Sequence, residues 1–339
     1  METIVVTGGS GFAASWIIRE LLTHDYQVRA FLQNMADAHS ISQAITLLQP
    51  LTLSENLTFY QFKPNSMTLA DWQKSMEGAD AVICLPLSES IDVDQSRPLK
   101  DDPLTILKAG KNCHIKRVIV TNPAFASLPL SSTGKRRISD EFWPDATAKL
   151  NGVESHLVEA EKSAWQYAKE NQLELTSILP GTTLGPILSP THLGDNQLLL
   201  SLFNDKKMAP KIEFNVSDVR DLAILYRLAL EKQSAIGHRF PAADQKITLA
   251  EIAKIYQRKY SRLNLNFTYT PNWLIRLAAI FSSSSKATAA KLKIAGYDTQ
   301  STRQILAWKQ RPVKETIVNA ADLFTLNELV KNVPERAYR

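Results

Sequence analysis

Apolar residues in the first half of the chain alternate between short continuous runs and runs at helical spacing. The β-branched segment 3–7 leads into glycines, and residues 12–22 (FAASWIIRELL) place apolar side chains three and four positions apart. This alternation predicts repeated βαβ units and a parallel sheet covered on both faces. Further strands are expected at 28–32, 57–62, 81–85, 117–121 and 173–179, with helices at 68–76, 103–113 and 153–171.

The pattern becomes less regular after Pro180. Residues 180–196 (PGTTLGPILSPTHLGDN) are rich in proline and glycine, which predicts a long loop. Beyond it we expect helices at 218–230, 248–260 and 272–280, a short strand at 265–269 and a surface loop at 282–285.

These elements predict an α/β protein with a Rossmann-type doubly wound parallel sheet. We assign residues 1–180 to a dinucleotide-binding domain, to which residues 216–246 return. A smaller C-terminal α/β substrate-binding part is expected to consist of residues 181–215 and 247–339.

The composition narrows the class of protein. The 339 residues are 44% hydrophobic and 22% charged, which is ordinary for a soluble globular protein with a substantial core. The net charge of +5 is mild, and the basic run 135–137 has no interleaved aromatic residues, so no nucleic-acid partner is expected. No apolar stretch approaches ~20 residues and no secretory signal is visible, so we expect no membrane association. Two isolated cysteines, Cys84 and Cys113, indicate a reducing, cytoplasmic compartment and no metal site.

The segment between the first strand and the first helix resembles a dinucleotide-binding loop. Gly8 and Gly11 allow a tight turn and a close approach to a pyrophosphate, and the helix that follows offers N–H groups and a positive dipole end. Ala14 takes the third glycine position and is small enough for close packing. A tight turn without a ligand is the alternative. The residues expected to bind NAD or NADP here are Thr7, Gly8, Gly9, Ser10, Gly11, Phe12 and Ala13.

The end of the second strand leaves the choice of dinucleotide open. Gln33 and Asn34 provide neither a carboxylate for the ribose 2′-hydroxyl of NAD nor an arginine for the 2′-phosphate of NADP. Either amide can hydrogen-bond a hydroxyl group. NAD is therefore at least as plausible as NADP, and both residues are candidate cofactor contacts.

Six sequence blocks occur in an order that is typical of one family. They are TGGSGFAASWIIRELL, EGADAVICL, IKRVIVT, AEKSAWQYAKENQLELTSILPGTTLGP, VSDVRDLAILYRLALEK and AWKQRPVKETI. On these blocks the chain resembles the extended short-chain dehydrogenases/reductases of the dihydroflavonol reductase and cinnamoyl-CoA reductase type, over nearly its full length. The resemblance implies a Rossmann fold, an NAD(P) cofactor and carbonyl reduction, with the cofactor carboxamide at the backbone of Pro180 and Gly181. Function still depends on the residues of the site.

The resemblance also implies three catalytic positions, and the chain departs from the family at each. In the family, a serine after the fifth strand, a tyrosine and a lysine four residues later perform the reduction. The lysine lowers the pKa of the phenol, which is otherwise near 10. Aligning AEKSAW with the family places Pro123, Val153 and Leu157 at these positions, and none of these side chains exchanges a proton. A continuous apolar stripe at helical spacing instead predicts a packed helix face: Val153, Leu157, Ala160, Ala164 and Ala168.

Three other groups are candidates for acid–base chemistry. Ser127 follows the fifth strand, His156 lies on the central helix and Lys149 precedes that helix. A loop serine, an exposed histidine and a solvated lysine are the alternatives. His192 and Asp195 lie in the loop expected to cover a substrate, so they are candidate substrate contacts.

The remaining charged residues near these segments are interpreted structurally. Glu159 and Glu161 are assigned to a solvated or interhelical face. Asp218, Arg220 and Asp221 are assigned to charge pairing at the start of a helix.

Joint loss of the three catalytic positions, together with the glycine loop, leads to the main hypothesis. It is an NAD(P)-binding or small-molecule-binding, regulatory protein that lacks the hydride-transfer residues. The alternative is an NAD(P)H-dependent carbonyl reductase or an epimerase that uses non-standard residues. A scaffold that no longer binds nucleotide is a third possibility, suggested by Lys63-Pro64 near the adenine position and Pro86-Leu87 after the fourth strand. In each case we expect a small-molecule ligand and a monomer or homodimer.

Overall fold

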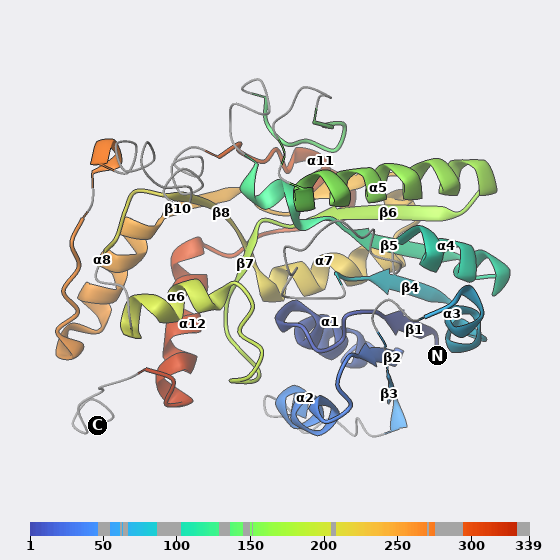
Figure 1. The fold of residues 1–339 in the computed structure, drawn as a ribbon, viewed down its shortest axis with the longest axis horizontal. Helices are drawn as coiled ribbons and strands as arrows, with labels where there is room; N and C mark the ends of the chain where they lie inside the picture. Colours follow the sequence, from blue (N-terminus) through green and yellow to red (C-terminus); the bar gives the residue numbers. More distant parts are fainter. Residues whose placement is uncertain are drawn as a thin grey trace.

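The large sheet is the centre of the molecule (Figure 1). A computed structural model describes residues 1–46, 55–61, 63, 67–86, 103–128, 136–144, 150, 152–204, 208–269, 271–274 and 294–330. The sheet has seven parallel strands in the order β3-β2-β1-β4-β5-β6-β9. The order reverses between β1 and β4, which confirms the predicted doubly wound Rossmann-type sheet. The strands are β1 (Thr3–Val6), β2 (Gln27–Leu32), β3 (Leu57–Gln61), β4 (Ala81–Cys84), β5 (Arg117–Thr121), β6 (Glu174–Leu179) and β9 (Arg239–Pro241).

Helices cover both faces of this sheet. The first face carries α1 (Phe12–Leu22), α2 (Asp37–Thr46) and α7 (Val219–Glu231), and the second carries α3 (Leu69–Met76), α4 (Pro103–Asn112) and α5 (Gly152–Asn171). Successive side chains of β1 alternate between the two cores. Ile4 and Val6 pack with α1, whereas Val5 packs with Trp72 of α3. Strands buried on both faces explain the continuous apolar runs of the sequence.

A second, smaller sheet lies beside the large one, on the left in Figure 1. Its strands are β7 (Thr182–Leu184), β8 (Glu213–Asp218) and β10 (Gln245–Thr248), and β8 pairs with β7 in parallel and with β10 antiparallel. It is accompanied by α6 (Asn196–Asn204), α8 (Leu249–Lys259) and α12 (Val313–Leu326), while α11 (Gln300–Leu306) lies near α7 and β9. Residues 219–241 return to the large sheet, and one apolar core connects both parts.

Some expected elements differ in the structure. The segment after Pro180 is not entirely a loop, because residues 182–184 form β7 by pairing with β8 far along the chain. The strand expected at 265–269 is reduced to a single bridge between Thr268 and Met208. The expected helix at 272–280 is described only as far as residue 274, and the expected loop at 282–285 lies outside the described residues.

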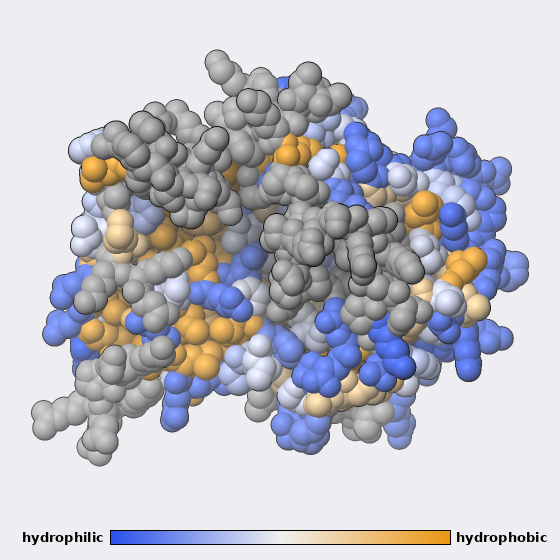
Figure 2. Space-filling view, in the orientation of Figure 1, coloured by the Kyte–Doolittle hydropathy of each residue, from blue (hydrophilic) through white to orange (hydrophobic). Residues whose placement is uncertain are grey.

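The visible surface is mixed in character. Figure 2 shows apolar side chains gathered on the side of the small sheet and polar side chains over much of the other side. Among the described residues, no helix is both long enough and apolar enough to cross a lipid bilayer.

Candidate functional site

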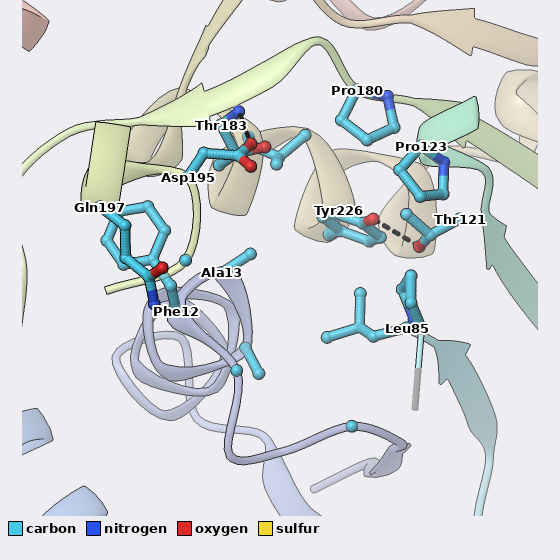
Figure 3. A pocket seen from close by; sticks show the side chains of 16 residues that line it. Phe12, Ala13, Leu85, Thr121, Pro123, Pro180, Thr183, Asp195, Gln197 and Tyr226 are labelled. Atoms are coloured by element: carbon cyan, nitrogen blue, oxygen red, sulfur yellow. Dashed lines mark hydrogen bonds between the residues drawn. The ribbon is translucent and has the colours of Figure 1, made fainter. Parts of the chain in front are cut away.

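A pocket of about 370 Å³ opens where the glycine loop meets the carboxyl ends of the strands (Figure 3). Parallel α/β sheets bind ligands at this edge, next to the point where the strand order reverses. The lining residues come from four places: Gly8, Gly11, Phe12, Ala13 and Ala14 from the first loop and α1, Leu85, Pro86, Thr121, Pro123 and Pro180 from strand ends, Thr183, Gly194, Asp195 and Gln197 from the small part, and Leu222 and Tyr226 from α7.

The glycine loop has a geometry suited to a phosphate. Gly8 has a φ of 62°, and a Cβ there would lie 2.5 Å from the Pro86 carbonyl oxygen, so only glycine fits. Gly11 caps α1 without a side-chain hydrogen bond. The N-terminal turn of α1 therefore faces the pocket with its positive dipole end, and its residues fit the pyrophosphate of a dinucleotide.

Thr7 and Gly9 support this loop from behind rather than lining the pocket. The Thr7 hydroxyl donates to the Leu85 carbonyl and accepts from the Leu85 N–H, both at 3.0 Å. The Gly9 N–H donates to the carbonyl of Phe31 at 2.8 Å. These bonds fix the loop between the ends of β2 and β4, and Ser10 is likewise absent from the pocket lining.

The residues expected near the adenosine lie at the same edge of the sheet but outside the pocket. Gln33 and Asn34 are exposed directly after β2. The Asn34 Oδ1 accepts a hydrogen bond from the Ala36 N–H at 3.0 Å, so part of its capacity is used locally.

Two of the three family catalytic positions are described at the level of side chains. Pro123 lines the pocket as the first residue of the short helix η2 (Pro123–Ser127). Leu157 is partly buried and packs against the apolar cluster around Phe125 and Val158. Val153 lies in the first turn of α5, and its side chain is outside the described part of the structure. Neither described side chain donates or accepts a proton.

The rest of the predicted stripe on α5 is packed as expected, since Ala160, Ala164 and Ala168 are all buried. The interpretation of Glu161 is corrected by the structure. It is 2% exposed, and its carboxylate bonds the guanidinium of Arg239 at 2.9 and 3.1 Å and the Asn122 amide at 2.8 Å. Sequence periodicity could not show this, because Arg239 comes from β9. Glu159 is exposed and pairs with Lys162, as a solvated face requires.

The substitute acid–base candidates do not converge on the pocket within the described residues. His156 is partly buried on α5 and is not among the lining residues. Ser127 ends η2, but its side chain is not described, and Lys149 lies outside the described residues.

Of the two candidate substrate contacts, only one lines the pocket. The Asp195 Oδ2 accepts a hydrogen bond from the Thr183 N–H at 2.8 Å and faces the cavity. The Nε2 of His192 is buried and has no hydrogen-bond partner among the described residues, and His192 is not one of the lining residues.

The backbone of Pro180 and Gly181 is engaged within the protein. The Tyr297 hydroxyl donates to the carbonyl of Pro180 at 2.8 Å, and the Gly181 N–H donates to the Ser217 hydroxyl at 2.9 Å. Pro180 lines the pocket through its ring side, whereas Gly181 does not line it. Of the two residues expected to meet the carboxamide, only Pro180 therefore contributes to the wall of the pocket.

Sequence reasoning missed a pair of hydroxyl groups in this wall. The Thr121 Oγ1 at the end of β5 lies 2.5 Å from the Tyr226 hydroxyl of α7, and both residues line the pocket. Burial raises the pKa of the Tyr226 phenol far above its usual value, so it stays protonated at neutral pH. No local signal marks Tyr226, because in the sequence it occupies one position of an ordinary amphipathic helix.

The charged residues at the start of α7 form a second polar cluster, outside the pocket. Asp218 caps α7 and bonds the Arg220 side chain at 2.7 and 3.0 Å, as expected from the sequence. Asp221 instead accepts from the backbone and guanidinium of Arg311. Burial raises the pKa of Asp221 to about 6.

Within the described residues, no group of three or more His, Cys, Asp or Glu side chains is arranged to hold a metal ion.

Comparisons with known proteins give the context for this pocket. No family model matches the chain. It is 29% identical over 279 residues to the cinnamoyl-CoA reductase CAD2 of Medicago truncatula, covering 78% of this chain and 82% of that protein. It is 26% identical over 279 residues to the bifunctional dihydroflavonol 4-reductase/flavanone 4-reductase of Malus domestica, covering 78% of each. This chain is a homologue of the extended short-chain dehydrogenases/reductases.

The solved structure of a yeast reductase has the same fold. The yeast methylglyoxal/isovaleraldehyde reductase Gre2, complexed with NADPH, superposes with a TM-score of 0.76 at 22% identity. The match covers 96% of this chain and 99% of the yeast chain. The fold shared with this reductase therefore includes the smaller part.

Proposed function

We propose that this chain binds NAD or NADP in the pocket at the N-terminus of α1. The observation that carries the proposal is that the start of α1, whose N-cap residue Gly11 makes no side-chain cap hydrogen bond, opens directly into the cavity after the tight turn at Gly8. A pyrophosphate is stabilised at such a helix end by backbone N–H groups and the helix dipole. The exposed amides of Gln33 and Asn34 fit either dinucleotide, so the affinities for NAD and NADP have to be measured to tell which one the protein prefers.

The activity that we propose to test first is reduction of a carbonyl compound. The named relatives are reductases, which favours this role over simple binding. When bound, a reduced dinucleotide supplies a hydride. A proton must then reach the carbonyl oxygen from another group, because Val153 stands at the family's tyrosine position and carries no proton to donate. Pro123 and Leu157 likewise replace the serine and the lysine of the family. Ser127, His156 and Lys149 remain the candidates from the sequence.

A second candidate role is binding of the dinucleotide without turnover, as a sensor or regulator. The side chains of Pro123 and Leu157 favour it, since neither can take part in acid–base chemistry. The apolar wall formed by Leu85, Pro86 and Leu222 would exclude water from the ligand in either role. A scaffold without nucleotide binding is the third possibility.

Calorimetric titration with NAD, NADH, NADP and NADPH separates the third possibility from the other two. We expect binding of at least one dinucleotide, and absence of heat with all four would overturn the proposal. Following NADH or NADPH absorbance with a panel of aldehydes and ketones then separates reduction from binding alone. If turnover is found, separate substitutions of Ser127, His156 and Lys149 identify the proton donor, whose loss should lower the rate about a hundredfold or more.

A further inference from the structure

The hydroxyl pair of Thr121 and Tyr226 carries an inference that goes beyond dinucleotide binding as such. Tyr226 is fully buried on α7, and Thr121 is partly buried at the carboxyl end of β5. Figure 3 shows the two side chains pointing toward each other beneath Pro123, on the wall of the cavity opposite Asp195. The pair therefore combines a buried phenol with a hydroxyl at the cavity surface.

Burial decides the direction of the hydrogen bond between them. If Thr121 donated, the Tyr226 proton would be left in the core without an acceptor among the described residues, which costs about 1–3 kcal/mol. A phenol is also the better donor, and burial keeps it protonated by raising its pKa. Tyr226 therefore donates to the Thr121 Oγ1.

When Tyr226 is the donor, the hydroxyl proton of Thr121 is available to a ligand in the pocket. Thr121 Oγ1 forms its one described hydrogen bond with Tyr226. The other threonine that lines the pocket, Thr183, already uses both of its donors: its N–H donates to Asp195, and its hydroxyl donates to the carbonyl of Gly181 at 3.3 Å. Donation by the phenol polarises the threonine hydroxyl and strengthens it as a donor.

The position of Thr121 in the sheet indicates which part of the ligand it meets. In a doubly wound fold, each half of the sheet binds one mononucleotide of a dinucleotide. Thr121 ends β5, in the half formed by β4, β5 and β6, whereas the glycine loop follows β1 and receives the pyrophosphate. Among the described lining residues of this half, Leu85, Pro86, Pro123 and Pro180 have apolar side chains.

We propose that Thr121, oriented by Tyr226, donates a hydrogen bond to an oxygen on the nicotinamide half of the bound dinucleotide. The acceptor is of the carboxamide or ribose class. Thr121 is the binding residue, and Tyr226 is a positioning residue that acts through it. This inference rests on the proposed dinucleotide binding and assigns two residues that the family's catalytic positions do not include.

The test compares a complete dinucleotide with ADP, which lacks the nicotinamide half. The dinucleotide is NADH or NADPH, whichever the unsubstituted protein binds more tightly, and affinities are measured by calorimetry. Thr121→Val and Tyr226→Phe are expected to weaken dinucleotide binding about two- to tenfold, the range of one net hydrogen bond, and to leave ADP binding unchanged. Thr121→Ser keeps the hydroxyl and should retain most of the affinity.

Tyr256→Phe is the matched control. Tyr256 is also a fully buried tyrosine, but its hydroxyl has no hydrogen-bond partner in the described part of the chain, and it does not line the pocket. This variant should bind both ligands like the unsubstituted protein. Thermal unfolding without ligand accompanies each measurement, because a purely structural role of Tyr226 would lower stability without separating the two ligands.

Each remaining outcome contradicts a defined part of the argument. Equal losses for ADP and the dinucleotide, or unchanged dinucleotide affinity in Thr121→Val, would overturn the role of Thr121. Loss in Thr121→Val but not in Tyr226→Phe would overturn the positioning role of Tyr226. Failure of the unsubstituted protein to bind any dinucleotide would instead overturn the proposed function, and this inference with it.

Discussion

At the scale of single residues, Gly8 is the position where the backbone conformation and the site depend on each other most directly. Its positive φ is accessible to glycine at little cost, and the Pro86 carbonyl leaves no room for a Cβ at 2.5 Å. The glycine loop thus packs against the end of β4 through contacts within the protein. A side chain here would displace the loop from the position that the pocket requires.

We predict that Gly8→Ala lowers dinucleotide affinity at least tenfold and destabilises the fold. The matched control is Gly78→Ala, since Gly78 has a φ of 70° but no described residue beyond its chain neighbours has an atom within 4 Å of the place that a Cβ would take. Both variants carry the strain of a left-handed alanine, about 1 kcal/mol or more, and only Gly8→Ala adds the steric contact. Calorimetry and urea unfolding measure the two effects. Equal affinity losses in both variants would contradict the role of the close approach to Pro86.

At the scale of elements, the buried pair of Glu161 and Arg239 connects α5 to β9. The Arg239 guanidinium also donates to the Phe142 carbonyl at 2.5 Å and lies 3.7 Å from the centre of the Trp143 ring. Asn122, directly before Pro123, donates to the same carboxylate. The wall of the pocket at the end of β5 is therefore held by a polar cluster with almost no access to water.

Glu161→Gln is expected to lower the free energy of unfolding by roughly 3–5 kcal/mol, because it leaves the Arg239 charge buried without its counter-ion. Glu159→Gln, on the same helix, removes an exposed carboxylate paired with Lys162, and surface pairs contribute about 0–1 kcal/mol. Urea unfolding of both variants at pH 7 provides the comparison. Similar losses of stability in the two variants would show that Glu161 is not the buried counter-ion of Arg239.

At the scale of the whole molecule, Asp221 joins the two parts of the chain. It lies on α7, against the large sheet, and accepts the Arg311 N–H at 2.6 Å just before α12 begins. The Trp308 Nε1 donates to the Asp221 carbonyl at 2.8 Å. Asp218, Arg220 and Glu315 supply the other charges of this junction.

The stability of this junction should depend on pH in a defined direction. Burial is the largest cause that raises the pKa of Asp221, and the nearby charge of Asp218 raises it further. Together they bring this pKa from 3.8 to about 6. A carboxyl with a raised pKa in the folded state contributes stability below pH 4, and this contribution is lost as the pH rises through about 6. The difference in pKa corresponds to about 3 kcal/mol at most.

Asp221→Asn keeps an uncharged acceptor at every pH and should remove this dependence. We expect the stability of the variant, relative to the unsubstituted protein, to increase between pH 4 and pH 7. Thermal or urea unfolding at several pH values in this interval measures the difference. Parallel stability profiles for the two proteins would contradict a raised pKa of Asp221.

Local sequence patterns were sufficient to locate several helices and strands. Continuous apolar runs and helical spacing located β1, β5, α1 and α5 to within a residue or two, because burial on one or two faces imposes these periods. The glycine loop was also recognisable in the sequence, because its tight turn needs a positive φ that glycine adopts at little cost, as Gly8 does. The apolar residues at positions 123 and 157 were equally visible in the sequence.

Contacts between residues far apart in the chain became visible only in the folded protein. Strand β7 exists because it pairs with β8, Glu161 is buried because Arg239 arrives from β9, and Tyr226 reaches the pocket because α7 packs beside β5. None of these contacts leaves a periodic trace, since each depends on one side chain from each of two segments far apart in the chain. A local pattern indicates that a residue is buried, whereas the residues that bury it are specified only by the fold.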